Sequence, residues 1–223
     1  MHETNILRKA GVNVTPFEPY RIGETQEINK AKSVALTKEF LKKISSGERY
    51  SSVFISSVLN SVPFAKDREK IACICAALCT NKTKLFAVAS STNQVGLKNV
   101  KGKNILSETN SNTLLFRLDY EDNITIGDFG EKPKVQKYHS QKEFYYLFKK
   151  YFKTVCINEF SNNVQAICLN VDYKKVCQDL RKALEFEFNL PYPDGSTMNL
   201  YNEAITAFQK RFKSYENANE LDF

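Results

Sequence analysis

The stretch VQKYHSQKEFYYLFKKYFK, residues 135–153, decides how this chain is expected to fold. It contains His139, and the only other histidine is the second residue of the chain. After His139, large apolar residues such as Phe144, Phe148 and Tyr151 recur at the spacing of a buried helical stripe. The pattern predicts an amphipathic helix that begins near His139 and lies across a sheet.

Helix-like and strand-like segments alternate on both sides of that helix. Apolar residues at helical spacing predict further helices over about 25–46, 49–60, 66–80, 173–183 and 197–215. Alternating or continuous apolar runs predict strands over 85–89, 113–120, 123–129, 164–171 and 184–190. We therefore expect an α/β fold with a mixed sheet of about four or five strands and helices packed on it. An N-terminal arm and helical segment would occupy 1–62, and the α/β domain 63–223.

The chain is basic, and this bears on the partners it could bind. Its net charge is +7 and its pI is about 9.0. A positive surface attracts polyanions, so an acidic partner such as nucleic acid or an acidic protein surface is expected, although ordinary solvated helix faces would give the same composition. The residues proposed to contact such a partner are Lys98, Lys101, Lys103, Lys149, Lys150 and Lys153.

Cysteine usage indicates a reducing compartment. There are six cysteines, and Cys73, Cys75 and Cys79 crowd into one apolar segment instead of spreading over loops. No apolar run is long enough to span a membrane, and no charged-then-apolar leader opens the chain. We expect the protein to work in a cytoplasm, either that of its own cell or that of a host.

From residue 66 onward, the order of elements resembles that of the cytidine deaminase-like superfamily, in particular its divergent bacterial toxin and effector branches. His139-Ser140-Gln141 stands where that family has His-x-Glu, and Cys177 stands at the second cysteine of its Pro-Cys-x-x-Cys motif. The resemblance implies that His139 and Cys177 would be zinc ligands. Gln141 would replace the glutamate that shuttles protons, and an amide cannot do so. The implied zinc ligand set is incomplete.

The resemblance and the clustered cysteines together lead to two functional hypotheses. The first is a deaminase-like protein that acts mainly by binding, as an effector, a toxin-related protein or a regulator. The second is an active hydrolase, either a divergent deaminase or a cysteine-dependent protease or deamidase that pairs His139 with one of the clustered thiols. Structural roles are the alternatives: His139 as a helix N-terminal residue bonded to backbone, and Cys177 as a buried small hydrophobe.

Overall fold

A computed structural model describes residues 2–20, 27–94, 113–118, 121–127 and 134–216. The chain forms two compact units, Met1–Glu48 with Leu184–Asn219 and Arg49–Ala183 with Glu220–Phe223. We call them the helical unit and the sheet unit. The boundary expected between residues 62 and 63 does not coincide with this division. No helix of the described residues is both long enough and apolar enough to cross a membrane.

The helical unit contains α1 (His2–Lys9), α2 (Lys30–Ser45), α7 (Tyr201–Glu216) and the last part of α6 (Tyr173–Asn189). Helix α2 begins at Asn29, whose side chain accepts a hydrogen bond from the Lys32 N–H, as an N-cap does. It ends before Gly47, whose φ of +75° suits glycine.

Two predictions for the helical unit are wrong. Residues 2–9, expected to belong to an irregular N-terminal arm, form α1. The strand predicted over 184–190 is the end of α6. Leu184 and Phe188 are both fully buried, and they lie one helical turn apart, so burial selects the helix over the alternating pattern.

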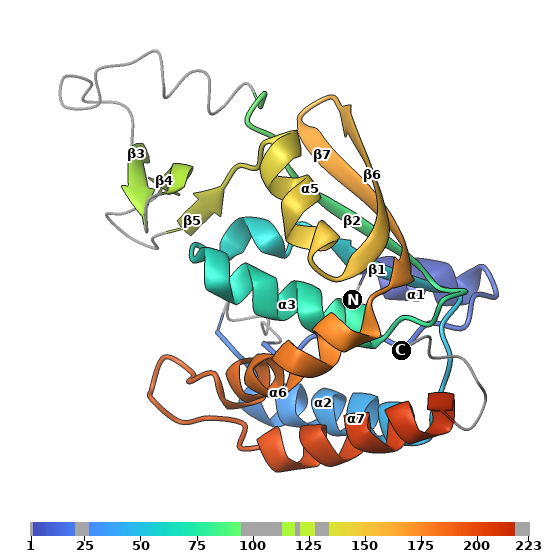
Figure 1. The fold of residues 1–223 in the computed structure, drawn as a ribbon. Coiled ribbons are helices and arrows are strands. Elements are labelled where there is room, and N and C mark those ends of the chain that lie inside the picture. The colour runs from blue at the N-terminus through green and yellow to red at the C-terminus, as the bar shows by residue number, and fades with distance from the viewer. Residues whose placement is uncertain (1, 21–26, 95–112, 119–120, 128–133, 217–223) are drawn as a thin grey trace. The chain divides into compact units, whose positions relative to one another are not determined.

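The sheet unit is built on four strands in the order β1-β2-β7-β6, which are Ser52–Ser56, Lys84–Ser90, Asn163–Val171 and Phe152–Phe160 (Figure 1). Strands β1 and β2 are parallel, whereas β7 is antiparallel to both β2 and β6. The predicted α/β class with a mixed sheet of four or five strands is confirmed. The helix predicted over 49–60 is wrong, because Val53 and Ile55 point inward and alternate with outward residues along β1.

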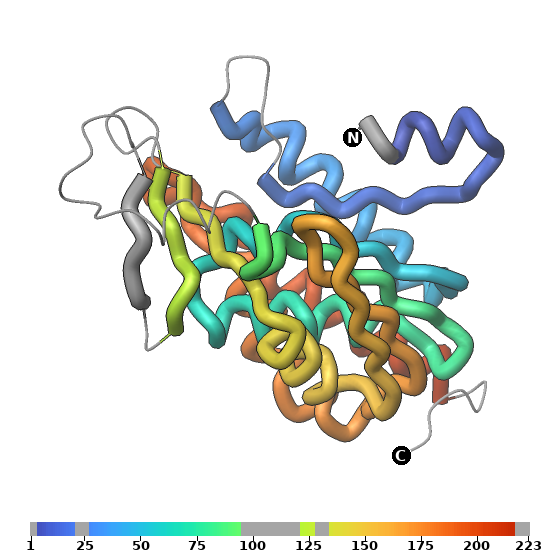
Figure 2. Tube along the Cα trace, turned by 90° about the horizontal axis from the view of Figure 1, so that it is seen from above, coloured from blue at the N-terminus to red at the C-terminus, as the bar shows by residue number. Residues whose placement is uncertain are grey.

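One face of this sheet forms the core of the unit. Its inward residues include Leu85, Ala87, Ala166 and Cys168, each at most 1% exposed. Helix α3 (Ala65–Ala77) lies between β1 and β2 in the chain, after the short 3-10 helix η1 (Leu59–Ser61). Helix α5 (Gln141–Lys149) lies beside the β6–β7 hairpin (Figure 2).

A small antiparallel sheet precedes α5. It consists of β3 (Thr113–Leu118), β4 (Glu121–Gly127) and β5 (Lys134–Lys137) in that order. The first part of the stretch 135–153 is therefore a strand, and its last two residues begin β6. Helix α5 starts after Ser140, because the Ser140 side chain and the Glu143 side chain cap one another's backbone N–H groups.

Candidate functional site

His139 is locked into the sheet unit by its backbone. Its N–H donates to the Ser90 carbonyl at 2.8 Å, and its carbonyl accepts from the Thr92 N–H at 3.1 Å. The imidazole is 2% exposed and is hydrogen-bonded to the backbone of Leu59, while Nε2 has no partner. Burial, with the neighbouring charges of Arg68 and Lys137, lowers the pKa of His139 to about 3, so the ring is neutral at physiological pH.

Gln141 occupies the first turn of α5 and binds a carboxylate. Its Nε2 donates to Glu159 at 2.8 Å, and the Ser91 hydroxyl donates to the other oxygen of the same carboxylate. Nearby, Asn60 accepts from the Ser90 N–H at 3.0 Å. These bonds join the end of β2, the start of α5 and the far end of β6. They hold these three elements together.

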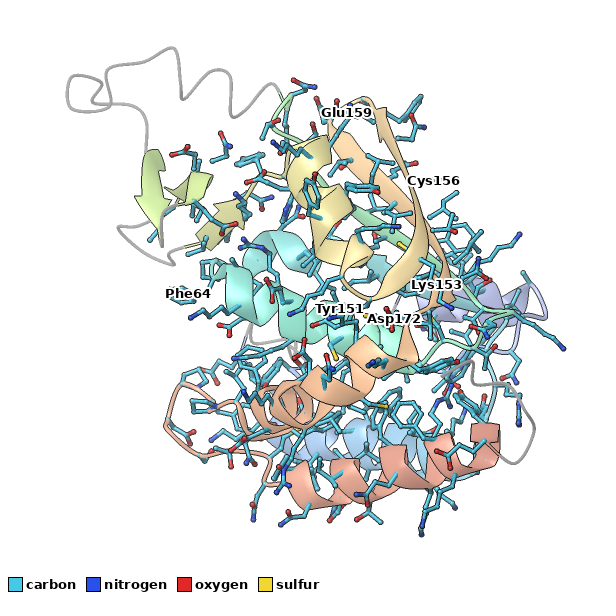
Figure 3. All side chains as sticks on the ribbon, viewed as in Figure 1. Phe64, Tyr151, Lys153, Cys156, Glu159 and Asp172 are labelled. Atoms are coloured by element: carbon cyan, nitrogen blue, oxygen red, sulfur yellow. The ribbon has the colours of Figure 1, made fainter. Side chains whose placement is uncertain are left out.

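Cys177 lies at the other end of the sheet. Strand β7 begins at Asn163, which pairs with Ser90 beside His139, and ends at Val171, just before α6. From Asn163 to Val171 the strand extends about 26 Å away from His139. Cys177 lies four residues into α6, and the helix rises only about 6 Å over those residues, too little to return to His139. Figure 3 shows Glu159 near one end of the β6–β7 hairpin and Asp172 at the other.

The structure therefore does not bring His139 and Cys177 together. Cys177 is exposed, so it is not a buried hydrophobe either. In the part of the chain that the structure describes, no group of three or more His, Cys, Asp or Glu side chains could hold a metal ion.

Cys73, one of the three clustered thiols, is a poor nucleophile. Cys73 is fully buried, its thiol donates to the Val176 carbonyl at 3.7 Å, and burial raises its pKa to about 12. It lies near Tyr151, at the sheet end opposite His139, because the Tyr151 carbonyl accepts from the Asp172 N–H. A protonated thiol far from the histidine cannot form a catalytic pair.

The lysines predicted to bind a polyanion lie partly outside and partly within the described residues. Lys98, Lys101 and Lys103 lie outside the described residues. Lys150 forms ion pairs with Glu69 at 2.8 Å and with Asp179 at 2.9 Å, which raise its pKa. These pairs connect Lys150 to α3 and α6.

The most distinctive surface of the sheet unit is the face of the four-stranded sheet that points away from its core. Residues paired across neighbouring strands share a face, so the register defines this outer face. It consists of Ser52, Phe54, Ser56, Lys84, Phe86, Val88, Ser90, Asn163, Gln165, Ile167, Leu169, Thr154, Cys156, Asn158 and Phe160.

One row of the outer face is apolar across all four strands. Phe54 pairs with Phe86, Phe86 with Ile167, and Ile167 with Cys156. Phe54 is 69% exposed and Ile167 42%, and the Phe54 and Phe86 rings stack with centroids 5.1 Å apart. Phe160, at the hairpin end of β6, is 70% exposed.

The outer face carries no carboxylate. Lys84 is its one charged residue among the strand positions that the structure describes. Sequence reasoning missed this surface because it assigned β1 to a helix and left most of β6 unassigned. The alternation of β1, in which Phe54 stands between Val53 and Ile55, was the signal that could have revealed it.

Comparison with known proteins finds partly similar solved structures at low sequence identity and does not show a family. No family model and no curated protein matches this chain. A crystal structure of the PH0226 protein from Pyrococcus horikoshii OT3 is 14% identical, with 76% of each chain covered and a TM-score of 0.48. A SAM-dependent methyltransferase from Methanosarcina mazei is 14% identical over 63% of this chain and 79% of its own, with a TM-score of 0.37. A SAM-dependent methyltransferase from Clostridium acetobutylicum is 10% identical over 75% and 69%, with a TM-score of 0.38.

The expected resemblance to cytidine deaminases is wrong. The histidine and cysteine that carried the resemblance lie at opposite ends of the sheet. The expected function as a deaminase-like effector, toxin-related protein or regulator is therefore wrong as well. The hydrolase alternative is wrong as well, because it requires either that zinc site or a reactive thiol beside His139.

Proposed function

We propose that this protein binds single-stranded nucleic acid on the outer face of its four-stranded sheet. The observation that supports this most directly is the row of Phe54, Phe86, Ile167 and Cys156 on a face without a carboxylate, in which every member except the half-buried Phe86 is exposed. Single-stranded nucleic acids present flat apolar bases and a negative backbone, and sheets with exposed aromatic residues are a recurrent surface for stacking them.

The charge of the face favours this partner over an ordinary protein surface. A base that stacks on Phe54 brings its phosphates to the rim of the row, where a carboxylate would repel them and a cation attract them. Lys84 lies on the same face, opposite Ser52 in β1, and the whole chain carries +7. Steering by this net charge would favour a polyanion at every encounter.

The geometry of the row leaves an aromatic face on which a base could stack. The Phe54 and Phe86 rings stack on one another with 12° between their planes, so each covers one face of the other, and a base would extend the stack on the opposite face of Phe54, which is 69% exposed. Phe160 adds a second exposed ring two rows away, at the hairpin end. Since none of the cysteines is in a disulfide, we propose a reducing cytoplasm, of its own cell or a host, as the place of action.

Fluorescence anisotropy with a labelled single-stranded oligonucleotide tests the proposal. Phe54→Leu keeps an apolar side chain in the strand and removes the aromatic face. We expect it to weaken binding by about 1–3 kcal/mol, roughly 5- to 150-fold in Kd. Tyr146→Leu is the matched control, since Tyr146 is 61% exposed on α5 and lies off the sheet.

Two results would overturn the proposal. One is a wild-type protein that binds neither single-stranded DNA nor RNA at 50 mM salt. The other is a Phe54→Leu variant that binds as tightly as the Tyr146→Leu control. A change of molecular mass in light scattering on Phe54→Leu, without oligonucleotide binding, would instead identify the face as a protein interface.

A further inference from the structure

The helical unit contains a separate groove between α2 and α7. It is an open groove with a volume of about 490 Å³. Leu41 and Ala207, both 4% exposed, are its buried apolar members, and the small side chain of Ala207 leaves the space open. Its other lining residues are Lys38, Lys42, Ser45, Asn202, Glu203, Thr206 and Lys210.

The groove concentrates positive charge that the chain does not neutralise. Lys38 and Lys42 lie one turn apart on α2, where like charges repel and cost a few tenths of a kcal/mol. Lys210 lines the same groove from α7. None of the three ammonium groups forms an ion pair or a side-chain hydrogen bond within the described residues, and Glu203 is the only acidic residue in the lining.

The neutral polar residues leave the ammonium groups as the main free donors. The Ser45 hydroxyl donates to the Lys42 carbonyl at 2.9 Å, and the Thr206 hydroxyl donates to the Asn202 carbonyl at 2.9 Å. The lining contains no aromatic side chain on which a base could stack. A ligand of this groove would therefore be recognised through negative charge and not through a base.

We infer that the α2–α7 groove binds the phosphodiester backbone of single-stranded nucleic acid, as an electrostatic contact separate from the outer face of the sheet. This inference rests on the proposed function. It assigns the groove residues Lys38, Lys42 and Lys210 to phosphate contacts, which the sequence did not single out together. The two contacts would depend differently on salt concentration, because phosphate contacts release counterions and stacking contacts do not.

Salt dependence of binding tests the inference. Each phosphate contact contributes about −0.7 to the slope of log K against log salt for a single strand. The triple variant K38Q/K42Q/K210Q should therefore have a slope shallower by about 2, and a Kd about 100-fold weaker at 0.1 M salt if the two lines meet near 1 M. The matched control is K174Q/K175Q/K182Q, which removes the same charge from exposed positions of α6.

The outcomes separate the inference from the proposed function. A groove variant with the slope of the α6 control overturns the inference, while loss of affinity in Phe54→Leu at unchanged slope still supports stacking. A shallower slope in the groove variant, with Phe54→Leu binding normally, supports the groove and overturns the sheet face. A wild type that is retained on heparin but binds no oligonucleotide overturns both in favour of another polyanion.

Discussion

Glu187 should make the stability of this protein fall as the pH rises. It lies on α6 in the helical unit with 9% of its surface exposed, and its carboxyl forms no ion pair among the residues described. Burial raises its pKa from 4.5 to about 7. The Tyr20 hydroxyl donates to the Glu187 carbonyl, not to the carboxyl, so it does not compensate the charge.

The direction and size of the change in folding stability follow from the difference between the Glu187 pKa in the folded and in the unfolded state. Below pH 4.5 the carboxyl is protonated in both the folded and the unfolded state, and its pKa shift has no effect. Between pH 4.5 and 7 the unfolded state ionises first, so folding loses stability until the folded state ionises too. A shift of this size corresponds to about 3 kcal/mol above pH 7, at 1.36 kcal/mol per pKa unit.

Urea unfolding followed by circular dichroism at pH 4.5 and pH 8 checks the prediction on Glu187→Gln. The amide cannot ionise, so we expect the variant to be more stable than the wild type by about 3 kcal/mol at pH 8 and by less than about 1 kcal/mol at pH 4.5. Glu185→Gln, at an exposed position of the same helix, is the control and should change little at either pH. A stability difference that is equal at the two pH values would refute the reasoning, as would a less stable Glu187→Gln at pH 8.

Three further predictions concern local structure. Gly47→Ala should cost at least about 1 kcal/mol and lower Tm more than Gly195→Ala. Both positions have positive φ, but only at Gly47 would a Cβ meet a neighbour, the Ser214 Oγ at 2.8 Å. Equal losses of Tm would contradict this. Native-state labelling with iodoacetamide at pH 8, read by mass spectrometry, should modify the exposed Cys156 and leave Cys73 intact, and fast labelling of Cys73 would disprove its burial as a protonated thiol. Ser140→Ala removes the capping box of α5 and should cost about 1 kcal/mol in urea unfolding, and an unchanged midpoint would count against that cap.

The sequence predicted the elements whose signal is local. The stripe of Phe144 and Phe148 correctly indicated α5, and the Ser140-x-x-Glu143 spacing contained the true start of that helix. The run from residue 164 to 171 correctly indicated an interior strand. The errors arose where the local pattern was ambiguous, as in α6, where alternating residues also fit one face of a helix.

The candidate site depended on contacts that local patterns do not encode. His139 and Cys177 are each consistent with a metal ligand, but the direction of β7 places them at opposite ends of the sheet. The row on the outer face joins Phe54, Phe86 and Ile167, which come from three separate parts of the chain. Without the strand register, these are three unrelated apolar residues.

The pairing of β2 with β7 also has a consequence for how the sheet assembles. Ser90 pairs with Asn163, so this seam closes a loop of more than seventy residues, whereas β6 and β7 meet through a tight turn at residues 161–162. Loop closure is slower for distant segments, so the β6–β7 hairpin should form early. Strand β2 should then pair with the free edge of β7. The β2–β7 seam is then the slow step in building the sheet, and the outer row becomes continuous only when that step is complete.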